Sequence, residues 1–262
     1  MTSANASGGL GARLSRISFG AVWDIVKHPS LIPVRFSRIS RSSIPEIVRF
    51  VFAGADRPAV EAYRKDFLLN HKFFEEINTR YVEKRGRRTS FEGWFELLYV
   101  LVRFARPAVI VETGIFDGHS SAVILQALDD NGAGELISID LPAYSEIKFS
   151  TSRMKDTILP SGCEPGWIIP DRLRPRHRLI LGSSEEFLPA VLSEKKIIDM
   201  FLHDSLHTYQ HQWFEYSTVW PYIRSGGLLM SDDVFWNVAF NRFCKSKGVS
   251  YRVSRGFGVA KK

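Results

Sequence analysis

The chain has 262 residues, of which 45% are hydrophobic and 24% are charged. Its formal net charge of +7 is unevenly distributed, because residues 1–100 hold 16 Lys and Arg against 10 Asp and Glu. This composition excludes a fibrous or wholly disordered chain, and it favours one globular domain with a basic N-terminal extension.

The first residues predict neither a signal peptide nor a membrane anchor. Residues 1–12 are small and polar, without a basic start followed by an apolar core, so we expect a disordered tail. No stretch approaches 18 uninterrupted apolar residues. Cys163 and Cys244 lie far apart without metal-ligand spacing and are expected to be reduced thiols. We therefore expect a cytoplasmic protein.

Residues 13–89 predict an N-terminal helical arm or cap. Scattered Arg and Ser separate apolar positions such as Trp23 and Val26. A basic amphipathic segment of this kind can rest on an anionic membrane surface. The simpler interpretation is a set of helices that packs on the main domain or on a second subunit, which would form a homodimer.

Residues 90–262 predict an α/β domain of the Rossmann-like, doubly wound kind. The apolar segment 91–104 predicts a helix that ends before Pro107. After it, short apolar runs alternate with helix-like segments, which is typical of a parallel sheet with helices on both faces. Strands are expected at 108–112, 136–140, 178–182, 197–203 and 228–231, and helices at 120–128, up to Leu192, at 208–223 and at 235–246.

Two segments depart from this alternation. Residues 141–177 are rich in Pro and Gly and longer than a usual connection, so we expect a helix and a flap that faces the substrate. The end of the chain, SYRVSRGFGVAKK, predicts an antiparallel hairpin that completes the sheet.

The predicted strands end on polar groups. The carboxyl ends of parallel strands meet at one edge of the sheet, where such folds bind ligands. The residues at these ends are Glu112, Asp140, Gly182, Asp204, Asp232 and Asp233.

The turn after the first strand reads VETGIFDGHSS and contains Gly114 and Gly118. Such a turn lets backbone N–H groups approach a ligand, although tight turns also need glycine and the three-glycine dinucleotide motif is absent. Asp140 follows Gly114 by 26 residues, a distance at which a carboxylate can bind a ribose, or else cap the next helix. Glu112 would repel a pyrophosphate but suits a cationic sulfonium, which favours S-adenosylmethionine (SAM) as the cofactor.

The chain resembles the class I SAM-dependent methyltransferases, in particular the macrocin-type and cephalosporin-pathway O-methyltransferases. The resemblance covers about residues 90–260 and depends on VETGIFDGHSS, LISIDLP, LILGSSEEFLP, IDMFLHDSLHTY and SGGLLMSDDV. It implies a sheet of seven strands whose last strand is antiparallel.

The resemblance also implies a cofactor site. Glu112, Gly114 and Gly118 would line the methionine end of the cofactor, and Ser120 and Ser121 would open the following helix. Asp140 would hold the ribose, and Ser184 and Glu185 would lie near the adenine. The run S-S-E-E beginning at Ser183 is also an ordinary helix N-cap, and the two interpretations are compatible.

The ends of the fourth and fifth strands predict a metal site. Asp204, Asp232 and Asp233 would repel one another without a cation, and carboxylates in this number suit Mg²⁺. As alternatives, Asp233 caps the next helix and no metal is used, or His203 and His207 bind zinc.

His207 follows Asp204 by three positions and is the candidate general base in a catalytic pair with it. A histidine can take the proton of a hydroxyl that attacks the sulfonium methyl while Mg²⁺ stabilises the oxyanion. Tyr209, Trp236 and Asn237 are candidates for the border of the acceptor pocket.

These features predict metal-assisted O-methylation of a hydroxylated small molecule, such as a sugar, a polyketide glycoside or a phenol. The first alternative is a metal-independent methyltransferase of the same fold. An NAD-dependent or nucleotide-sugar oxidoreductase, a nucleic-acid methyltransferase and a non-catalytic partner are less well supported. The basic N-terminal region alone does not indicate specific nucleic-acid binding.

Overall fold

The computed structural model describes residues 43–91, 93–142 and 158–262. The predicted tail at 1–12, the start of the predicted arm and residues 143–157 of the predicted helix and flap lie outside these residues. Within the described residues, no helix is long and apolar enough to cross a membrane.

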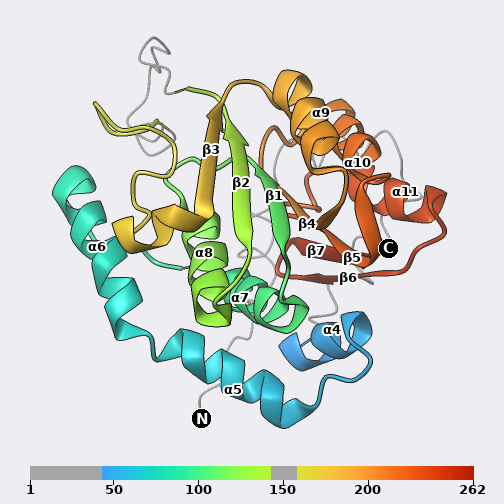
Figure 1. The fold of residues 1–262 in the computed structure, drawn as a ribbon, viewed down its shortest axis with the longest axis horizontal. Coiled ribbons are helices and arrows are strands. Elements are labelled where there is room, and N and C mark those ends of the chain that lie inside the picture. The colour runs from blue at the N-terminus through green and yellow to red at the C-terminus, as the bar shows by residue number, and fades with distance from the viewer. Residues whose placement is uncertain (1–42, 92, 143–157) are drawn as a thin grey trace, which may run out of the picture.

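A mixed sheet of seven strands forms the centre of the molecule, in the order β3-β2-β1-β4-β5-β7-β6 (Figure 1). β1 to β5 run parallel, β7 pairs antiparallel with β5, and β6 pairs antiparallel with β7. The predicted doubly wound sheet with an antiparallel last strand is therefore confirmed. The strands are β1 (Val109–Thr113), β2 (Glu135–Asp140), β3 (His177–Leu181), β4 (Ile198–His203), β5 (Ile223–Ser231), β6 (Tyr251–Ser254) and β7 (Phe257–Lys261).

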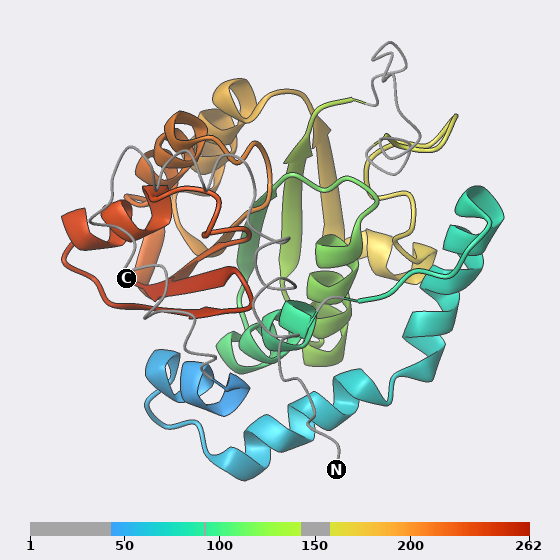
Figure 2. The same ribbon diagram turned by 180° about the vertical axis from the view of Figure 1, so that it is seen from behind.

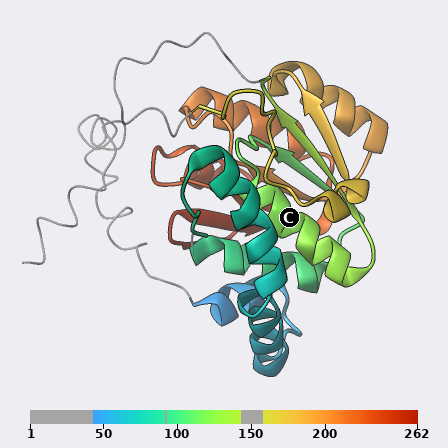
Figure 3. The same cartoon turned by 90° about the vertical axis from the view of Figure 1, so that its left-hand side faces the viewer.

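Side chains that alternate along each strand divide the apolar core into two layers. Ile110 packs in one layer and Val111 in the other, and Met200 and Phe201 divide in the same way. One layer lies under α9 (Ser184–Lys195), α10 (Tyr209–Val219) and α11 (Ala239–Ser246). The other lies under α7 (Gly93–Ala105) and α8 (His119–Asn131), and Figure 3 shows the sheet between the two groups of helices.

The N-terminal helices are α4 (Ile44–Val51), α5 (Arg57–Leu68) and α6 (His71–Arg85), and they run along the outside of α7 and α8 (Figure 2). They share one apolar core with α7 and α8, to which Val48, Phe67 and Phe73 contribute. They therefore pack on the same polypeptide as the sheet. The division into 13–89 and 90–262, and a homodimer, stay predictions.

Three predicted boundaries differ from the structure by four or five residues. The helix expected at 208–223 ends at Val219, since Trp220 is followed by Pro221, which cannot continue the helical hydrogen bonds. β5 begins at Ile223, five residues earlier than expected, because Gly226 and Gly227 lie within the strand and not in a turn before it. The helix expected from 235 begins at Ala239.

Candidate functional site

The loop between β1 and α8 has a backbone that only glycine fits at two positions. Gly114 has a φ of 81°, and a Cβ there would lie 2.2 Å from the carbonyl oxygen of Asp204. Gly118 has a φ of 104°, and its Cβ would lie 2.7 Å from the Cα of Gly166. Close contact with other backbone segments therefore accounts for both glycines, and it brings the loop against the end of β4.

Asp140 lies beside this loop, as the sequence predicts. Its Oδ2 accepts hydrogen bonds of 2.8 Å from the backbone N–H groups of Ile115 and Phe116. Its Oδ1 accepts one of 2.7 Å from the N–H of Leu141. A carboxylate offers about four acceptor positions, so these contacts leave capacity for a ligand hydroxyl.

Glu112 is fully buried beneath the loop. Its carboxylate accepts hydrogen bonds from the hydroxyls of Ser120 and Ser121, both 2.6 Å, and of Ser138, 2.9 Å. Burial raises the pKa of Glu112 to about 7, although the three serine hydroxyls act in the opposite direction. Three of the predicted cofactor residues thus form an internal network that fixes the start of α8 to β1.

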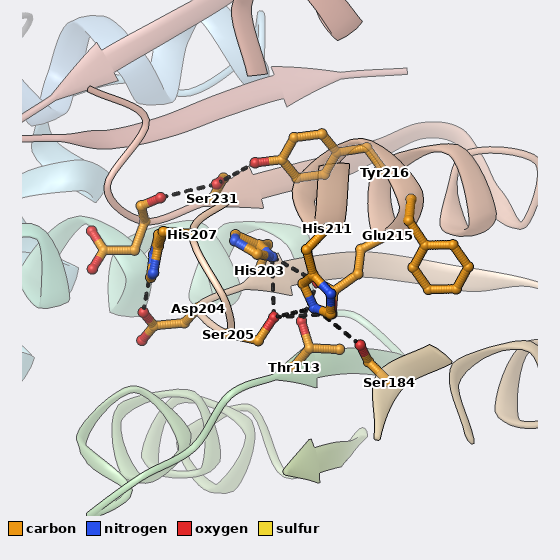
Figure 4. Close-up of polar contacts among 12 residues, drawn as sticks. Thr113, Ser184, His203, Asp204, Ser205, His207, His211, Glu215, Tyr216 and Ser231 are labelled. Carbon is orange, nitrogen blue, oxygen red and sulfur yellow. Dashed lines mark hydrogen bonds and ion pairs between the residues drawn. The ribbon is translucent and has the colours of Figure 1, made fainter. Parts of the chain in front are cut away.

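The carboxyl ends of β4 and β5 bring Asp204, His207 and Asp232 together. Each offers one potential ligand atom, and these atoms all lie within 4.8 Å of one another. His207 Nε2 lies 3.9 Å from Asp204 Oδ1 and has no hydrogen-bond partner in the described part of the chain, although it is buried (Figure 4). Two carboxylates and an imidazole are a donor set that fits a divalent cation.

The environment of His207 favours the neutral ring. Burial lowers the pKa of His207 to about 4, and the neighbouring His203 acts in the same direction. Near neutral pH the ring can therefore offer a lone pair, as a metal ligand or a proton acceptor requires.

Asp233 does not belong to this group, although the sequence predicted it as a ligand. Its φ is 49°, and its Oδ1 lies 3.9 Å from the position of a Cβ on Gly256, in the turn between β6 and β7. The alternative that Asp233 caps the next helix was wrong, because α11 begins at Ala239 after Val238. Of the two adjacent aspartates, only Asp232 belongs to the group within 4.8 Å.

Glu215 on α10 is the residue that the sequence analysis missed. It is fully buried beside the carboxyl ends of β1 and β4. Its carboxylate accepts hydrogen bonds from Thr113 Oγ1 at 2.6 Å and Ser205 Oγ at 2.9 Å, and it contacts His203 Nδ1 at 2.6 Å and His211 Nε2 at 2.9 Å (Figure 4). Burial acts to raise the pKa of Glu215, but the two histidines outweigh it and hold the pKa well below its usual range.

A sequence signal for Glu215 existed. The buried positions of α10 are Gln212, Glu215, Tyr216 and Val219, which follow the spacing of one helix face. A carboxylate within such a stripe must find hydrogen-bond partners.

The zinc alternative requires His203 and His207 to bind the same ion. His203 Nδ1 contacts Glu215, and His203 is not part of the group that His207 forms with the two aspartates.

The start of α9 lies close to this network. Ser184 Oγ lies 3.2 Å from His211 Nε2, and Glu185 Oε1 lies 2.8 Å from His211 Nδ1. Ser183 caps the helix, since its side chain accepts a hydrogen bond from the N–H of Glu186. The N-cap interpretation of this motif is therefore confirmed.

Two of the three candidates for the acceptor border lie next to His207. Asn237 Nδ2 donates a hydrogen bond of 3.0 Å to the carbonyl oxygen of His207, and the ring centres of Trp236 and His207 are 5.3 Å apart. Tyr209 instead stacks on Trp213 with ring centres 5.7 Å apart.

Comparison with known proteins agrees with this architecture. Residues 111–234 match the sequence model of a family described as a methyltransferase domain. Comparison with curated proteins gave no match.

Solved structures with this fold include two O-methyltransferases. One is an O-methyltransferase from Bacillus cereus in complex with SAH, at 14% identity over 78% of this chain and 97% of that one, with a TM-score of 0.50. The other is the O-methyltransferase TomG from Streptomyces achromogenes, involved in tomaymycin synthesis and in complex with SAM. It shares 17% identity over 78% of this chain and 95% of its own, with a TM-score of 0.50.

The segment that matches runs from β1 to the end of β5, within the seven-stranded sheet with its antiparallel β7. Over this segment the protein is similar to methyltransferase domains.

Proposed function

We propose that the enzyme transfers the methyl group of SAM to a hydroxyl oxygen of a small molecule. The main support is one juxtaposition. The loop that would hold the cofactor contacts the backbone of Asp204, and Asp204 forms a group with His207 and Asp232. A sulfonium methyl over the loop and an acceptor oxygen at this group would be neighbours, as in-line displacement requires. The two solved structures with this fold described above are both named O-methyltransferases.

The cofactor would lie across the carboxyl ends of β1 to β3. In this proposal Gly114 and Gly118 admit its methionine end, and Asp140 accepts from the ribose hydroxyls. Ser184 and Glu185 would border the adenine. The hydrogen bonds of Ser120 and Ser121 to Glu112, beneath the loop, would hold the loop and the start of α8 in place for the cofactor.

Asp204 and Asp232 would hold a divalent cation, for which Mg²⁺ is the first candidate from their ligand chemistry. When bound, such an ion lowers the pKa of a coordinated hydroxyl and stabilises the oxyanion. Two residues are candidates for the third ligand. The sequence proposes Asp233, whereas the structure groups His207 with Asp204 and Asp232.

His207 would accept the proton of the attacking hydroxyl through Nε2, which has no hydrogen-bond partner in the described residues. One nitrogen atom cannot bind a metal ion and accept a proton at the same time. If His207 is the base, the ion must therefore be held by carboxylates alone.

The acceptor would be a hydroxylated small molecule such as a sugar, a polyketide glycoside or a phenol. Leu206 and Trp236 border the group of potential ligands and are 59% and 46% exposed. Large apolar side chains at that position suit an acceptor with an apolar face next to its hydroxyl.

The test has two steps. Calorimetry with S-adenosylhomocysteine (SAH), and separately with NAD, should show binding of SAH alone. Methyl transfer from labelled SAM to a panel of phenols and glycosides should then be lost in Asp204→Asn and His207→Ala. A chain that fails to bind SAH would exclude this function.

A metal-independent route is the second candidate. The observation that favours it is the 3.9 Å approach of His207 Nε2 to Asp204 Oδ1, a pair that could take up a proton without an ion. Turnover that persists at full rate in EDTA would support this route, and recovery of lost turnover by Mg²⁺ or Mn²⁺ would exclude it.

A further inference from the structure

The last residue of α6, Arg85, reaches into the loop between β1 and α8. Its Nη2 donates a hydrogen bond of 2.8 Å to Oδ1 of Asp117, and it lies 3.2 Å from Oδ2. The side chains of Arg85 and Asp117 are only 8% and 3% exposed. Because both charges are buried, loss of either partner costs more than it would in an exposed pair, so this pair fixes the geometry more strongly.

Asp117 also contacts a second segment outside the loop. Trp167 Nε1 donates a hydrogen bond of 2.7 Å to Oδ1 of Asp117. Trp167 in turn stacks on Tyr81 of α6, with ring centres 5.7 Å apart and an angle of 20° between the planes. The carboxylate of Asp117 is therefore held jointly by α6 and by the segment that precedes β3.

The backbone of the loop is held from the same side. The N–H of Gly166 donates to the carbonyl oxygen of Phe116 at 2.8 Å, and the N–H of Ile168 donates to that of Asp117 at 3.2 Å. From the other side, Asp140 accepts from the N–H groups of Ile115 and Phe116. Two independent sets of contacts thus determine one loop conformation.

That conformation needs such support. Gly114, Phe116 and Gly118 have φ values of 81°, 49° and 104°, all in the left-handed region. A phenylalanine in this region persists only where the surrounding structure imposes it. Arg85 and Trp167 supply contacts to the residue that follows Phe116, and the guanidinium carbon of Arg85 lies 5.6 Å from the centre of the Phe116 ring.

We propose that Arg85 is a positioning residue for the cofactor loop. Through its buried ion pair with Asp117, the N-terminal helices hold residues 114–118 in the conformation that binds SAM. This inference rests on the proposed role of the loop, and it gives α6 a function in cofactor binding that the sequence did not indicate.

The experiment measures the dissociation constant for SAH by calorimetry, with unfolding in urea measured in parallel. Arg85→Met should weaken SAH binding by tenfold or more, and Arg85→Lys should recover part of the loss because it restores the positive charge. Asp117→Asn, which keeps the shape of the side chain, should weaken binding as well. The double variant Arg85→Met/Asp117→Asn should be weakened by less than the product of the two single effects.

Arg103→Met is the matched control. Arg103 is another largely buried arginine, but it lies on α7 and contacts Tyr99 and Asn131 at the other end of α7 and α8. The variant Arg103→Met should lower the free energy of unfolding. The affinity of the folded variant for SAH should equal that of the wild type.

The outcomes distinguish the positioning role of Arg85 from the proposed methyl-transfer function. Wild-type SAH affinity in folded Arg85→Met, or an equal loss in Arg103→Met, would overturn the positioning role and leave the proposed function intact. If Arg85→Met does not fold, the affinities of Asp117→Asn and Arg85→Lys decide in the same way. Absence of SAH binding by the wild-type chain would instead overturn the proposed function, and this inference with it.

Discussion

Glu215 and His203 contact each other at 2.6 Å, and neither side chain is exposed to solvent. The contact joins α10 to the last residue of β4, one position before Asp204. Since Glu215 also accepts from Thr113 at the end of β1, a single carboxylate connects the two strand ends that carry the proposed cofactor and acceptor sites.

We predict that Glu215→Ala lowers the free energy of unfolding by about 3–5 kcal/mol, as expected when a buried carboxylate that several polar groups contact is removed. Urea denaturation followed by circular dichroism measures this. Glu185→Ala is the control, because Glu185 contacts the same His211 but its side chain is 57% exposed. That change should cost no more than about 0.5 kcal/mol. Equal losses of unfolding free energy in the two variants would contradict the view that the burial of Glu215 makes its contacts stabilising.

Glu112 should make stability depend on pH. The folded-state pKa of Glu112 is about 7, above its ordinary value of 4.5, so the folded protein retains a proton that the unfolded chain releases between these values. The contribution of Glu112 to stability is therefore fully present below about pH 4.5 and is lost as the pH rises toward 7, by up to about 3 kcal/mol. Glu112→Gln should remove this component. Denaturation at pH 5, 6, 7 and 8 tests it, and parallel profiles for the two proteins would contradict the prediction.

Gly114→Ala should be far more harmful than alanine at another left-handed glycine. A Cβ at position 114 would lie 2.2 Å from a backbone oxygen of Asp204, so β4 or the loop must move. We expect a loss of more than about 2 kcal/mol in stability and no measurable SAH binding. The control is Gly132→Ala at the end of α8, where φ is 70° and a Cβ meets nothing within 4 Å. It should cost only about 1 kcal/mol and leave SAH affinity unchanged. The idea fails if both variants bind SAH equally well.

Two sets of metal ligands can be distinguished by experiment. The structure groups Asp204 and Asp232 with His207, and the sequence grouped them with Asp233. With Asp204 and Asp232 as ligands, Asp204→Asn and Asp232→Asn should each weaken Mn²⁺ binding by about 100-fold or more, measured by calorimetry or electron paramagnetic resonance. Asp233→Asn should have a smaller effect, because Asp233 lies outside the group within 4.8 Å. A loss in Asp233→Asn equal to the other two would instead support the set read from the sequence.

Much of the fold could be predicted because buried strands leave a local signal. Runs such as LISID are short, apolar and bounded by turn residues, so their order along the chain defined a parallel sheet with its ligand edge. The start of β5 was wrong because Gly226 and Gly227 interrupt its apolar run. The pairs Ile198–Ile223 and Met200–Leu228 with β4 place them in an irregularity inside one strand. Strand pairing depends on residues distant in sequence, which no local pattern records.

For the site, the sequence by itself determined which residues reach the carboxyl edge, since strand ends and the side chains that follow them are set by local periodicity. It placed Asp140 beside Gly114 and brought Asp204, His207 and Asp232 together. Only the tertiary structure decided which groups touch. Glu112 turned out to accept hydrogen bonds from serines, and Asp233 to lie outside the group that Asp232 joins. Arg85 and Glu215 turned out to contact the loop and the strand ends. The physical reason is that hydrogen bonds and ion pairs extend over only about 3 Å, so they depend on how helices pack and not on where residues stand in the chain.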